Sequence, residues 1–430
     1  MGSAGVSLND YSRLLRGNRN FRRLWLAQIV SEIGDWLYTV AIYTLLLDLT
    51  GTAQSIALAV VLQVLPQCFI APLAGVVNDR VSRRRVMIAA DLARAVIVLG
   101  MLFVSRAQMV PLIYFLLLLE TLMWAFFEPG RSAMVPNITT PGELVTANSL
   151  SSMTWSLNLA LGSGLGGLVA AFMGRDAVFV INSVSFLVSA TLLRGMRVEE
   201  HHLRGVKPLG LRDLVDFSPM KEGIRYIASD KRLFALLLAK AGLGVLAPHW
   251  VVLPIYGERI FPVRGSGLDI KRGAMLGMSA LMAARGMGAL LGPYIGSLWA
   301  GRDPVRLRRG ILLGFLTGAV GYVGLSMAPS LWVACLTVVL AHGGGSMIWV
   351  FSTTLLQCQT EDRFRGRVFS ADFAFMVVSM SVASYSAGAF VDGGVPVRSV
   401  ALATGLLTLV PAAAWWWALR LWRERAAGER

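Results

Sequence analysis

Apolar residues occur along this chain in long runs, and short polar segments separate the runs. Each run is long enough for an α-helix that crosses a bilayer, which needs about 20 apolar residues. Glycine, proline and charged residues, which are typical of turns, stand between the runs. The pattern predicts an all-α membrane protein with twelve transmembrane helices at 24–47, 54–77, 86–105, 109–130, 148–173, 177–195, 233–256, 273–299, 310–328, 331–356, 367–391 and 397–421.

The composition agrees with a membrane location. Hydrophobic residues make up 55% of the 430 residues and charged residues 15%, and the mean hydropathy is +0.62. Soluble proteins average about 25% charged residues, so a soluble chain of this composition could not cover its surface with polar groups. The first apolar run is longer than a signal-peptide core and lacks an A-x-A-like end. We therefore expect it to be retained as an anchor.

The net charge of +15 reflects topology rather than nucleic-acid binding. Most of the 40 Lys and Arg residues fall in the predicted loops and tails on one side, and few fall in the loops on the other. An even number of spans places both termini on the same side, and basic residues are enriched in cytoplasmic segments. The sequence therefore predicts a multi-pass protein of the inner (plasma) membrane, with both termini cytoplasmic.

The two halves of the chain resemble each other. Residues 71–75 read Ala-Pro-Leu-Ala-Gly and residues 292–296 read Gly-Pro-Tyr-Ile-Gly, and each segment ends a span before a basic loop. Duplicated halves related by an axis along the membrane normal are a transporter architecture. We expect two pseudo-symmetric six-helix bundles at 1–196 and 232–430, with a cytoplasmic linker at 197–231.

The loop after the second run carries a recognisable motif. It reads Gly75-Val-Val-Asn-Asp79-Arg80-Val-Ser82-Arg83-Arg84-Arg85. The segment resembles the G-x-x-x-D-R-x-G-R-R-K signature of the major facilitator superfamily, with Ser82 in place of glycine and Arg85 in place of lysine. The alternative is a basic stop-transfer cluster. The resemblance implies the fold of that superfamily and a conformational gate made of Gly75, Asp79, Arg80, Arg83, Arg84 and Arg85.

Two features of this gate have a physical rationale. Glycine at position 75 is expected to let two helices approach closely. Asp79 is expected to face the positive N-terminal end of another helix. Because these residues lie far from the middle of the membrane, we expect them to control conformational switching and not substrate affinity.

Further segments resemble the drug- and siderophore-efflux branch, which includes macrolide exporters and the enterobactin exporter. They are Asn18–Gln28, Gly34–Trp36, Leu49–Gly51, Asp91–Ala95, Ala147-Asn148 and Gly366–Phe369. The fifth run contains Gly162-Ser163-Gly164-Leu165-Gly166-Gly167, which is similar to the core of the antiporter motif, although Ser163 replaces the usual proline. Close packing of small residues would also explain this segment.

Ionisable side chains inside the predicted helices mark a candidate site, because they are costly near mid-bilayer and usually face a cavity. In the first helix Gln28, Glu32 and Asp35 share one stripe with Tyr38. At 1.5 Å per residue Asp35 lies ~16 Å deep, near the midplane of a core ~30 Å thick. Two carboxylates one turn apart suit a proton carrier. The alternative is a structural ion pair of Asp35 with Arg94 or Arg285.

Polar and aromatic residues also recur on the fourth and tenth helices. Glu120, Trp124 and Glu128 are spaced by four residues, and His342 and Trp349 share a face of the tenth helix. The superfamily lines its cavity with helices 1, 4, 7 and 10, so the resemblance makes both faces candidate substrate walls. It also implies that Glu128 pairs with the Arg83–Arg85 cluster. Plain packing of the tryptophans and a hydrogen-bonded histidine are the alternatives.

Three more charges complete the candidate set. Asp91 and Arg94 lie one turn apart and can pair. Arg285 needs a partner such as Asp35 or Glu120. The long side chain of Lys240 can extend its ammonium group to the membrane surface. The candidate coupling site and substrate cavity comprises Gln28, Glu32, Asp35, Asp91, Arg94, Glu120, Trp124, Arg285, His342 and Trp349.

These patterns predict a proton-coupled exporter of amphipathic small molecules, a monomeric antiporter of the multidrug-resistance type that works by alternating access. Another cation could replace the proton. A lysophospholipid flippase of the same fold and the membrane subunit of an ATP-driven pump are the alternatives. None of the five lysines precedes Ser or Thr, so there is no phosphate-binding loop. Metal-ligand spacings, hydrolase motifs and nucleic-acid motifs are absent as well, so we expect no enzyme activity, metal, cofactor or nucleic-acid partner.

Overall fold

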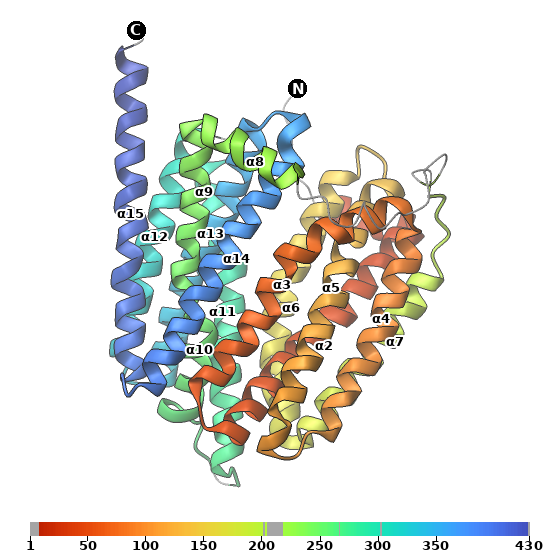
Figure 1. Cartoon of the computed structure of the whole chain (residues 1–430), viewed down its shortest axis with the longest axis vertical. Coiled ribbons are helices and arrows are strands. Elements are labelled where there is room, and N and C mark those ends of the chain that lie inside the picture. The colour runs from red at the N-terminus through yellow and green to blue at the C-terminus, as the bar shows by residue number, and fades with distance from the viewer. Residues whose placement is uncertain (1–7, 201–202, 204–217, 266, 302, 429–430) are drawn as a thin grey trace. The chain divides into compact units, whose positions relative to one another are not determined.

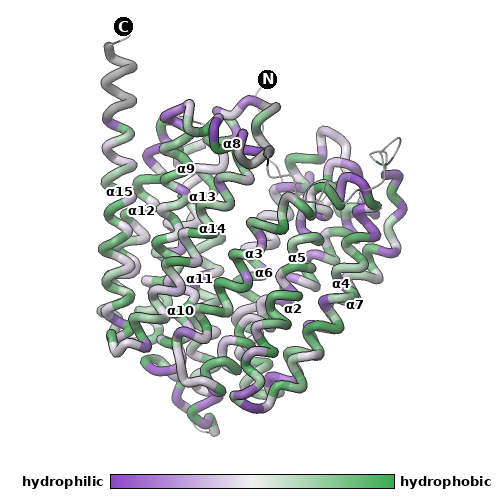
Figure 2. Tube along the Cα trace, viewed as in Figure 1, coloured by the Kyte–Doolittle hydropathy of each residue, from purple (hydrophilic) through white to green (hydrophobic). Residues whose placement is uncertain are grey.

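The computed structural model describes residues 8–200, 203, 218–265, 267–301 and 303–428, and every regular element among them is a helix (Figure 1). Twelve of the described helical segments are long and apolar enough to cross a membrane. The predicted fold class and the predicted number of spans are therefore confirmed. Hydrophobic residues follow the helices over most of their length, and hydrophilic residues gather near the helix ends (Figure 2).

Each predicted window overlaps one observed span, and most ends agree to within five residues; the exceptions are the end of the fourth window, the start of the ninth and the end of the twelfth, where the helix is six to eight residues longer. The first six spans are formed by α2 (Arg19–Thr50), α3 (Ala53–Arg80), α4 (Arg83–Leu99) with η1 (Gly100–Phe103), η2 (Ala107–Met109) with α5 (Val110–Ile138), α6 (Leu144–Met173) and α7 (Arg175–Arg194). The last six are formed by α9 (Lys231–Leu243) with α10 (His249–Ile255), α11 (Ile270–Ala300), α12 (Pro304–Met327), α13 (Leu331–Gln359), α14 (Asp362–Asp392) and α15 (Val397–Gly428). Two short helices, α1 (Leu8–Gly17) and α8 (Ser218–Ser229), precede the two halves.

The seventh span is not the single helix that the sequence predicts. α9 ends in a 3-10 turn, η5 (Gly244–Leu246), and α10 ends in a π-helical turn, η6 (Tyr256–Ile260). Pro248 precedes α10 and Pro254 lies inside it. Proline has no backbone N–H and its ring collides with the preceding turn, which explains the interruption. Broken spans are common around the binding sites of transporters.

Acidic and hydroxyl side chains begin several spans in the described structure. Asp230, Asp269, Asp303 and Ser330 each accept a hydrogen bond from a backbone N–H in the first turn of α9, α11, α12 and α13, respectively. Such caps satisfy N–H groups that have no partner within the helix. They fix where these helices begin; the predicted starts agree to within three residues for α9, α11 and α13, whereas α12 begins six residues before its predicted start.

The chain forms two compact units. Unit 1 comprises Met1–Leu45 and Phe69–Asp216, and unit 2 comprises Leu46–Cys68 and Phe217–Arg430. The helix α3 is continuous, yet its first part, up to Cys68, belongs to unit 2 and its second part to unit 1. Of the predicted linker 197–231, residues 201–202 and 204–217 lie outside the described residues.

Candidate functional site

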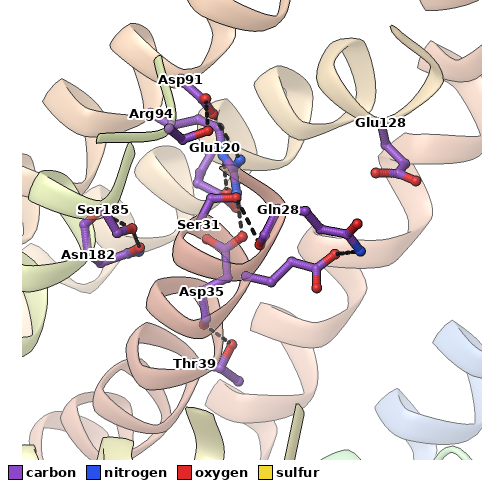
Figure 3. Close-up of polar contacts among 12 residues, drawn as sticks. Gln28, Ser31, Asp35, Thr39, Asp91, Arg94, Glu120, Glu128, Asn182 and Ser185 are labelled. Carbon is purple, nitrogen blue, oxygen red and sulfur yellow. Dashed lines mark hydrogen bonds and ion pairs between the residues drawn. The ribbon is translucent and has the colours of Figure 1, made fainter. Parts of the chain in front are cut away.

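Arg94 of α4 is surrounded by three carboxylates inside unit 1 (Figure 3). Its Nη2 lies 2.7 Å from Oδ2 of Asp35 on α2, and its Nε lies 2.9 Å from Oε1 of Glu120 on α5. Its Nη1 lies 3.6 Å from Oδ1 of Asp91, one turn earlier on α4. The ring of Phe186 covers the guanidinium at 4.0 Å. The structure thus brings together four residues that the sequence singles out.

The four charged groups differ in their access to solvent. The side chains of Arg94 and Asp91 are 1% and 0% exposed, that of Glu120 is 11% exposed, and that of Asp35 is 26% exposed. Asp91 is also held by Ser189, whose Oγ donates a 2.6 Å hydrogen bond to Oδ2. Asp35 is therefore the most exposed carboxylate of this cluster.

The small residues of α6 hold α2 in place beside this cluster. A Cβ added to Gly162 would lie 2.6 Å from the Cβ of Trp36, and one added to Gly166 would lie 2.9 Å from the Cα of Leu37. Side chains larger than hydrogen would push the two backbones apart. Close packing accounts for the small residues of the fifth span.

A second polar network starts from Glu32, one turn from Asp35 on α2. The Nε2 of Gln28 donates a 2.9 Å hydrogen bond to Oε1 of Glu32, and the Nδ2 of Asn158 donates a 2.8 Å bond to Oε2. Arg131 donates from Nη1 to Oε1 of Gln28 at 3.2 Å and from Nε to Glu128 at 2.8 Å. The network therefore runs along the interior of unit 1 from Glu128 to Glu32.

The expected pairing of Glu128 with the Arg83–Arg85 cluster is wrong. Glu128 instead pairs with Arg131 on its own helix. Arg131 falls outside the fourth predicted window, which ends at residue 130. The helix α5 instead continues to Ile138 through Pro129 and Pro136. The half-buried Trp124 lies on the same helix.

In the gate motif, Asp79 is largely exposed in the conformation described. Its side chain is 74% exposed, and its Oδ1 lies 3.4 Å from Nη2 of Arg83, one turn further along the chain. Arg83 also donates to the backbone oxygens of Asn78 at 3.2 Å and Ala133 at 3.0 Å. Arg83 thereby ties the end of α3 to the end of α5.

Elsewhere in the gate motif, the structure accounts for serine in place of glycine at position 82 and contradicts the close helix contact expected at Gly75. Ser82, which replaces glycine, caps α4 by accepting a hydrogen bond from the N–H of Arg85 at 3.3 Å. Arg84 donates to the backbone oxygen of Met196, and Arg80 is half-buried. Gly75 is not at a close helix contact, because a Cβ added there would meet nothing within 4 Å.

In unit 2, Lys240 of α9 is buried in an ion pair. The prediction that its side chain reaches the membrane surface is therefore wrong. Its Nζ lies 2.6 Å from Oδ2 of Asp372 on α14 and 2.9 Å from Oγ1 of Thr353. The two charged side chains are 4% and 2% exposed. Trp349, whose ring centroid lies 4.4 Å from Nζ, is 39% exposed. Asp372 was not among the predicted site residues, although an acidic residue inside an apolar window was the available signal.

The remaining candidates lie in a cluster of aromatic residues in unit 2. The guanidinium of Arg285 lies 3.8 Å from the ring centroid of Trp250. His342 packs edge-on against His249, with centroids 4.6 Å apart, and its Nε2 lies 3.3 Å from the hydroxyl of Tyr322. Asp35 and Glu120, the partners that we expected for Arg285, bind Arg94 instead. The contact of His342 with Tyr322 agrees with the alternative that His342 is a hydrogen-bonded histidine and not part of a substrate wall.

The described residues form twelve apolar spans with charged clusters buried among them, and such buried charges in membrane proteins often mark transport pathways. A family model described as transmembrane secretion effector, from the major facilitator superfamily, matches residues 15–428. The chain belongs to this superfamily, as its gate motif indicated. It is a multi-pass membrane transporter for small molecules, and it is not an enzyme.

Relatives with efflux-related names cover most of the chain. Macrolide efflux protein A of Streptococcus pyogenes is 24% identical over 86% of this chain and 89% of its own length. The putative bacilysin exporter BacE of Bacillus subtilis is 22% identical over 85% of this chain and 87% of its own length. A bacterial homologue of the human lysosomal transporter Spinster has the same fold, with a TM-score of 0.68 and 14% identity over 96% of this chain and 98% of its own.

Proposed function

We propose that this chain is a proton-coupled exporter of amphipathic small molecules that works by alternating access. In this proposal a monomer in the plasma membrane, with cytoplasmic termini, uses the bundles 1–196 and 232–430 as its moving parts and 197–231 as their linker. The efflux-related names of the relatives favour export over import. Their cargoes, a macrolide and bacilysin, suggest the kind of molecule that is moved.

The cluster around Arg94 is the observation that carries the proposal. One positive charge faces three carboxylates, of which Asp35 is the most exposed. A buried cation is costly when it loses its only partner. Because Arg94 keeps Glu120 and Asp91 when Asp35 takes up a proton, the cluster can hold or release that proton without leaving a bare buried charge. Such a group can exchange a proton for cargo during each transport cycle.

The network around Glu32 can assist this exchange. Glu32 lies one turn from Asp35 on α2 and accepts hydrogen bonds from Gln28 and Asn158. Gln28 connects it to Arg131 and therefore to Glu128. We propose that these hydrogen bonds position Glu32 as a second carboxylate that takes up and releases a proton, one turn from Asp35.

A pair of aromatic side chains between α2 and α6 suits an amphipathic cargo. Trp36 on α2 packs edge-on against Trp155 on α6, with ring centroids 6.0 Å apart, and Trp155 is 43% exposed. An aromatic ring offers apolar area and also attracts cationic groups. The carboxylates and rings of unit 1 thus favour a cargo with an apolar body and a polar or cationic group.

The experiment is uphill transport by the full chain in proteoliposomes with an imposed pH gradient. A radiolabelled macrolide should accumulate only in the presence of the gradient, in the direction opposite to proton flow, and a protonophore should abolish the accumulation. Protein-free liposomes are the control. Movement that is equal with and without the gradient would refute proton coupling. Gradient-independent movement of a lysophospholipid in place of the macrolide would favour a flippase.

A further inference from the structure

The end of α14 holds the beginning of α3 through one side chain. Oδ1 of Asp392 accepts a 2.7 Å hydrogen bond from the N–H of Ala53, and Oδ2 accepts a 2.8 Å bond from the N–H of Gln54. The first N–H groups of an α-helix have no partner within the helix. Asp392 therefore caps α3 from a position 339 residues away from Ala53 in the chain.

This position is unfavourable for an aspartate with respect to its own helix. Asp392 is the last residue of α14, and the last turn of α14 contains no basic residue. A negative charge is disfavoured at the C-terminal end of a helix and favoured at an N-terminal end. Thr52, the local residue in position to cap α3, donates its hydroxyl to Thr50 instead, at 3.1 Å. The contact with α3 is what makes Asp392 favourable here.

The two helices also touch closely next to this cap. Gly388 lies one turn before Asp392 on α14, and a Cβ added to it would lie 2.7 Å from the Cβ of Ala57 and 2.9 Å from Oε1 of Gln54. Ala53 and Ala57 are fully buried. The cap therefore belongs to a packed contact between α3 and α14 within unit 2.

Two further polar contacts hold the preceding turn. Nη2 of Arg259 donates a 2.8 Å hydrogen bond to the backbone oxygen of Gly51, and Nζ of Lys271 lies 3.5 Å from Oδ2 of Asp48. Residues 46–68 belong to unit 2 with all of these partners, whereas α2 before residue 46 and α3 after residue 68 belong to unit 1. These contacts therefore join the end of α2 and the first part of α3 to unit 2.

We propose that Asp392 is a conformational latch that holds residues 46–68 in unit 2 and releases them during the transport cycle. The latch lies on the side of the membrane opposite the two termini. Asp392 is exposed to solvent, so water can replace the two N–H groups as its partners when the latch opens. The proposal rests on the proposed alternating access, which requires contacts at one end of the spans to break and re-form.

The test measures the separation of α3 from the end of α14 by electron–electron resonance between two spin labels. Labels are attached to the exposed positions Thr52→Cys and Val395→Cys in the full chain, with the three native cysteines replaced by serine, in lipid nanodiscs without cargo. Asp392→Ala should raise the ratio of long to short distances about fivefold, which corresponds to about 1 kcal/mol for the loss of a helix cap. Asp392→Asn, which keeps the shape and one acceptor oxygen, should give a smaller increase.

The matched control is Asp269→Ala, because Asp269 lies on the same side of the membrane and caps its own helix, α11, through the N–H of Arg272. This substitution should leave the distances unchanged. Unchanged distances in both Asp392 variants would overturn the latch, as would equal increases in the control. The measurement needs neither cargo nor a pH gradient. A distance change in Asp392→Ala would therefore support the latch even if the parent protein proved not to be coupled to protons.

Discussion

Arg94 and Asp35 are joined by a 2.7 Å hydrogen bond between α4 and α2. The two side chains differ in exposure, since that of Arg94 is 1% exposed and that of Asp35 is 26% exposed. The cation is fixed in the interior by Glu120 and Asp91, whereas its third partner lies at the edge of the buried region. Asp35 is thus the member of the cluster whose charge can change with the least disturbance of the others.

This relationship predicts that Asp35→Asn uncouples transport from the pH gradient. The amide has the shape of the protonated acid but cannot release a proton. Gradient-driven accumulation of cargo in proteoliposomes should be abolished, while binding and downhill equilibration of cargo persist. Asp176→Asn, which changes an exposed acid at the start of α7, should transport like the parent protein. Full gradient-driven transport by Asp35→Asn would make Asp35 structural and place the coupling site elsewhere.

Most of the fold could be predicted because its signals are local. A run of apolar residues specifies that a span is present, whatever the rest of the chain does, although its exact start can depend on a cap such as Asp303, which begins α12 six residues before its predicted start. The break in the seventh span was missed because prolines are tolerated in membrane helices when neighbouring groups satisfy the backbone. The extension of α5 was missed because the apolar window ends before the charged Arg131, whereas the helix continues through Pro129 and Pro136 to Ile138.

The candidate site could be predicted only in part. Asp35, Arg94 and Glu120 were found because an ionisable residue stands out within an apolar run. The ion pairs of Arg94 with Asp35 and with Asp91 were among the expected alternatives, and the structure contains both. The pairs of Arg94 with Glu120 and of Lys240 with Asp372 depend on which helix faces lie together, and no periodicity within a single helix contains that information. Gly75 shows the opposite error, since a motif glycine was expected at a tight contact and lies in open space in this conformation.

For the gate motif we predict that Asp79→Asn slows transport without weakening equilibrium binding of cargo. In the conformation described, Asp79 makes an exposed contact with Arg83 at 3.4 Å, and exposed ion pairs contribute about 0–1 kcal/mol. The midpoint of thermal unfolding should therefore hardly change, while the initial rate of cargo flux falls. Asp79→Glu keeps the charge and serves as the control. A large loss of binding with an unaltered rate per bound cargo would contradict the gate role.

The buried pair in unit 2 predicts a strong dependence of each partner on the other. Lys240→Met alone leaves Asp372 as an uncompensated buried charge, and Asp372→Leu alone leaves Lys240. Each single change should lower the free energy of unfolding by about 3–5 kcal/mol, and the double variant should recover most of that loss. Equilibrium unfolding of the four proteins in detergent measures the coupling. Losses that simply add in the double variant would show that the pair is not coupled.

The contact between α2 and α6 predicts opposite effects for two glycine-to-alanine substitutions in helices. At Gly166 the new methyl group would lie 2.9 Å from the Cα and 3.2 Å from the backbone oxygen of Leu37. Backbone atoms cannot move aside as a flexible side chain can, so Gly166→Ala should destabilise the protein by about 1–3 kcal/mol. At Gly75 the same methyl group meets nothing within 4 Å, so Gly75→Ala should be neutral or stabilise α3 by up to about 1 kcal/mol. Unfolding midpoints in the same detergent measure both effects. If the two substitutions changed the midpoint equally, close packing against α2 would not be the reason for glycine at position 166.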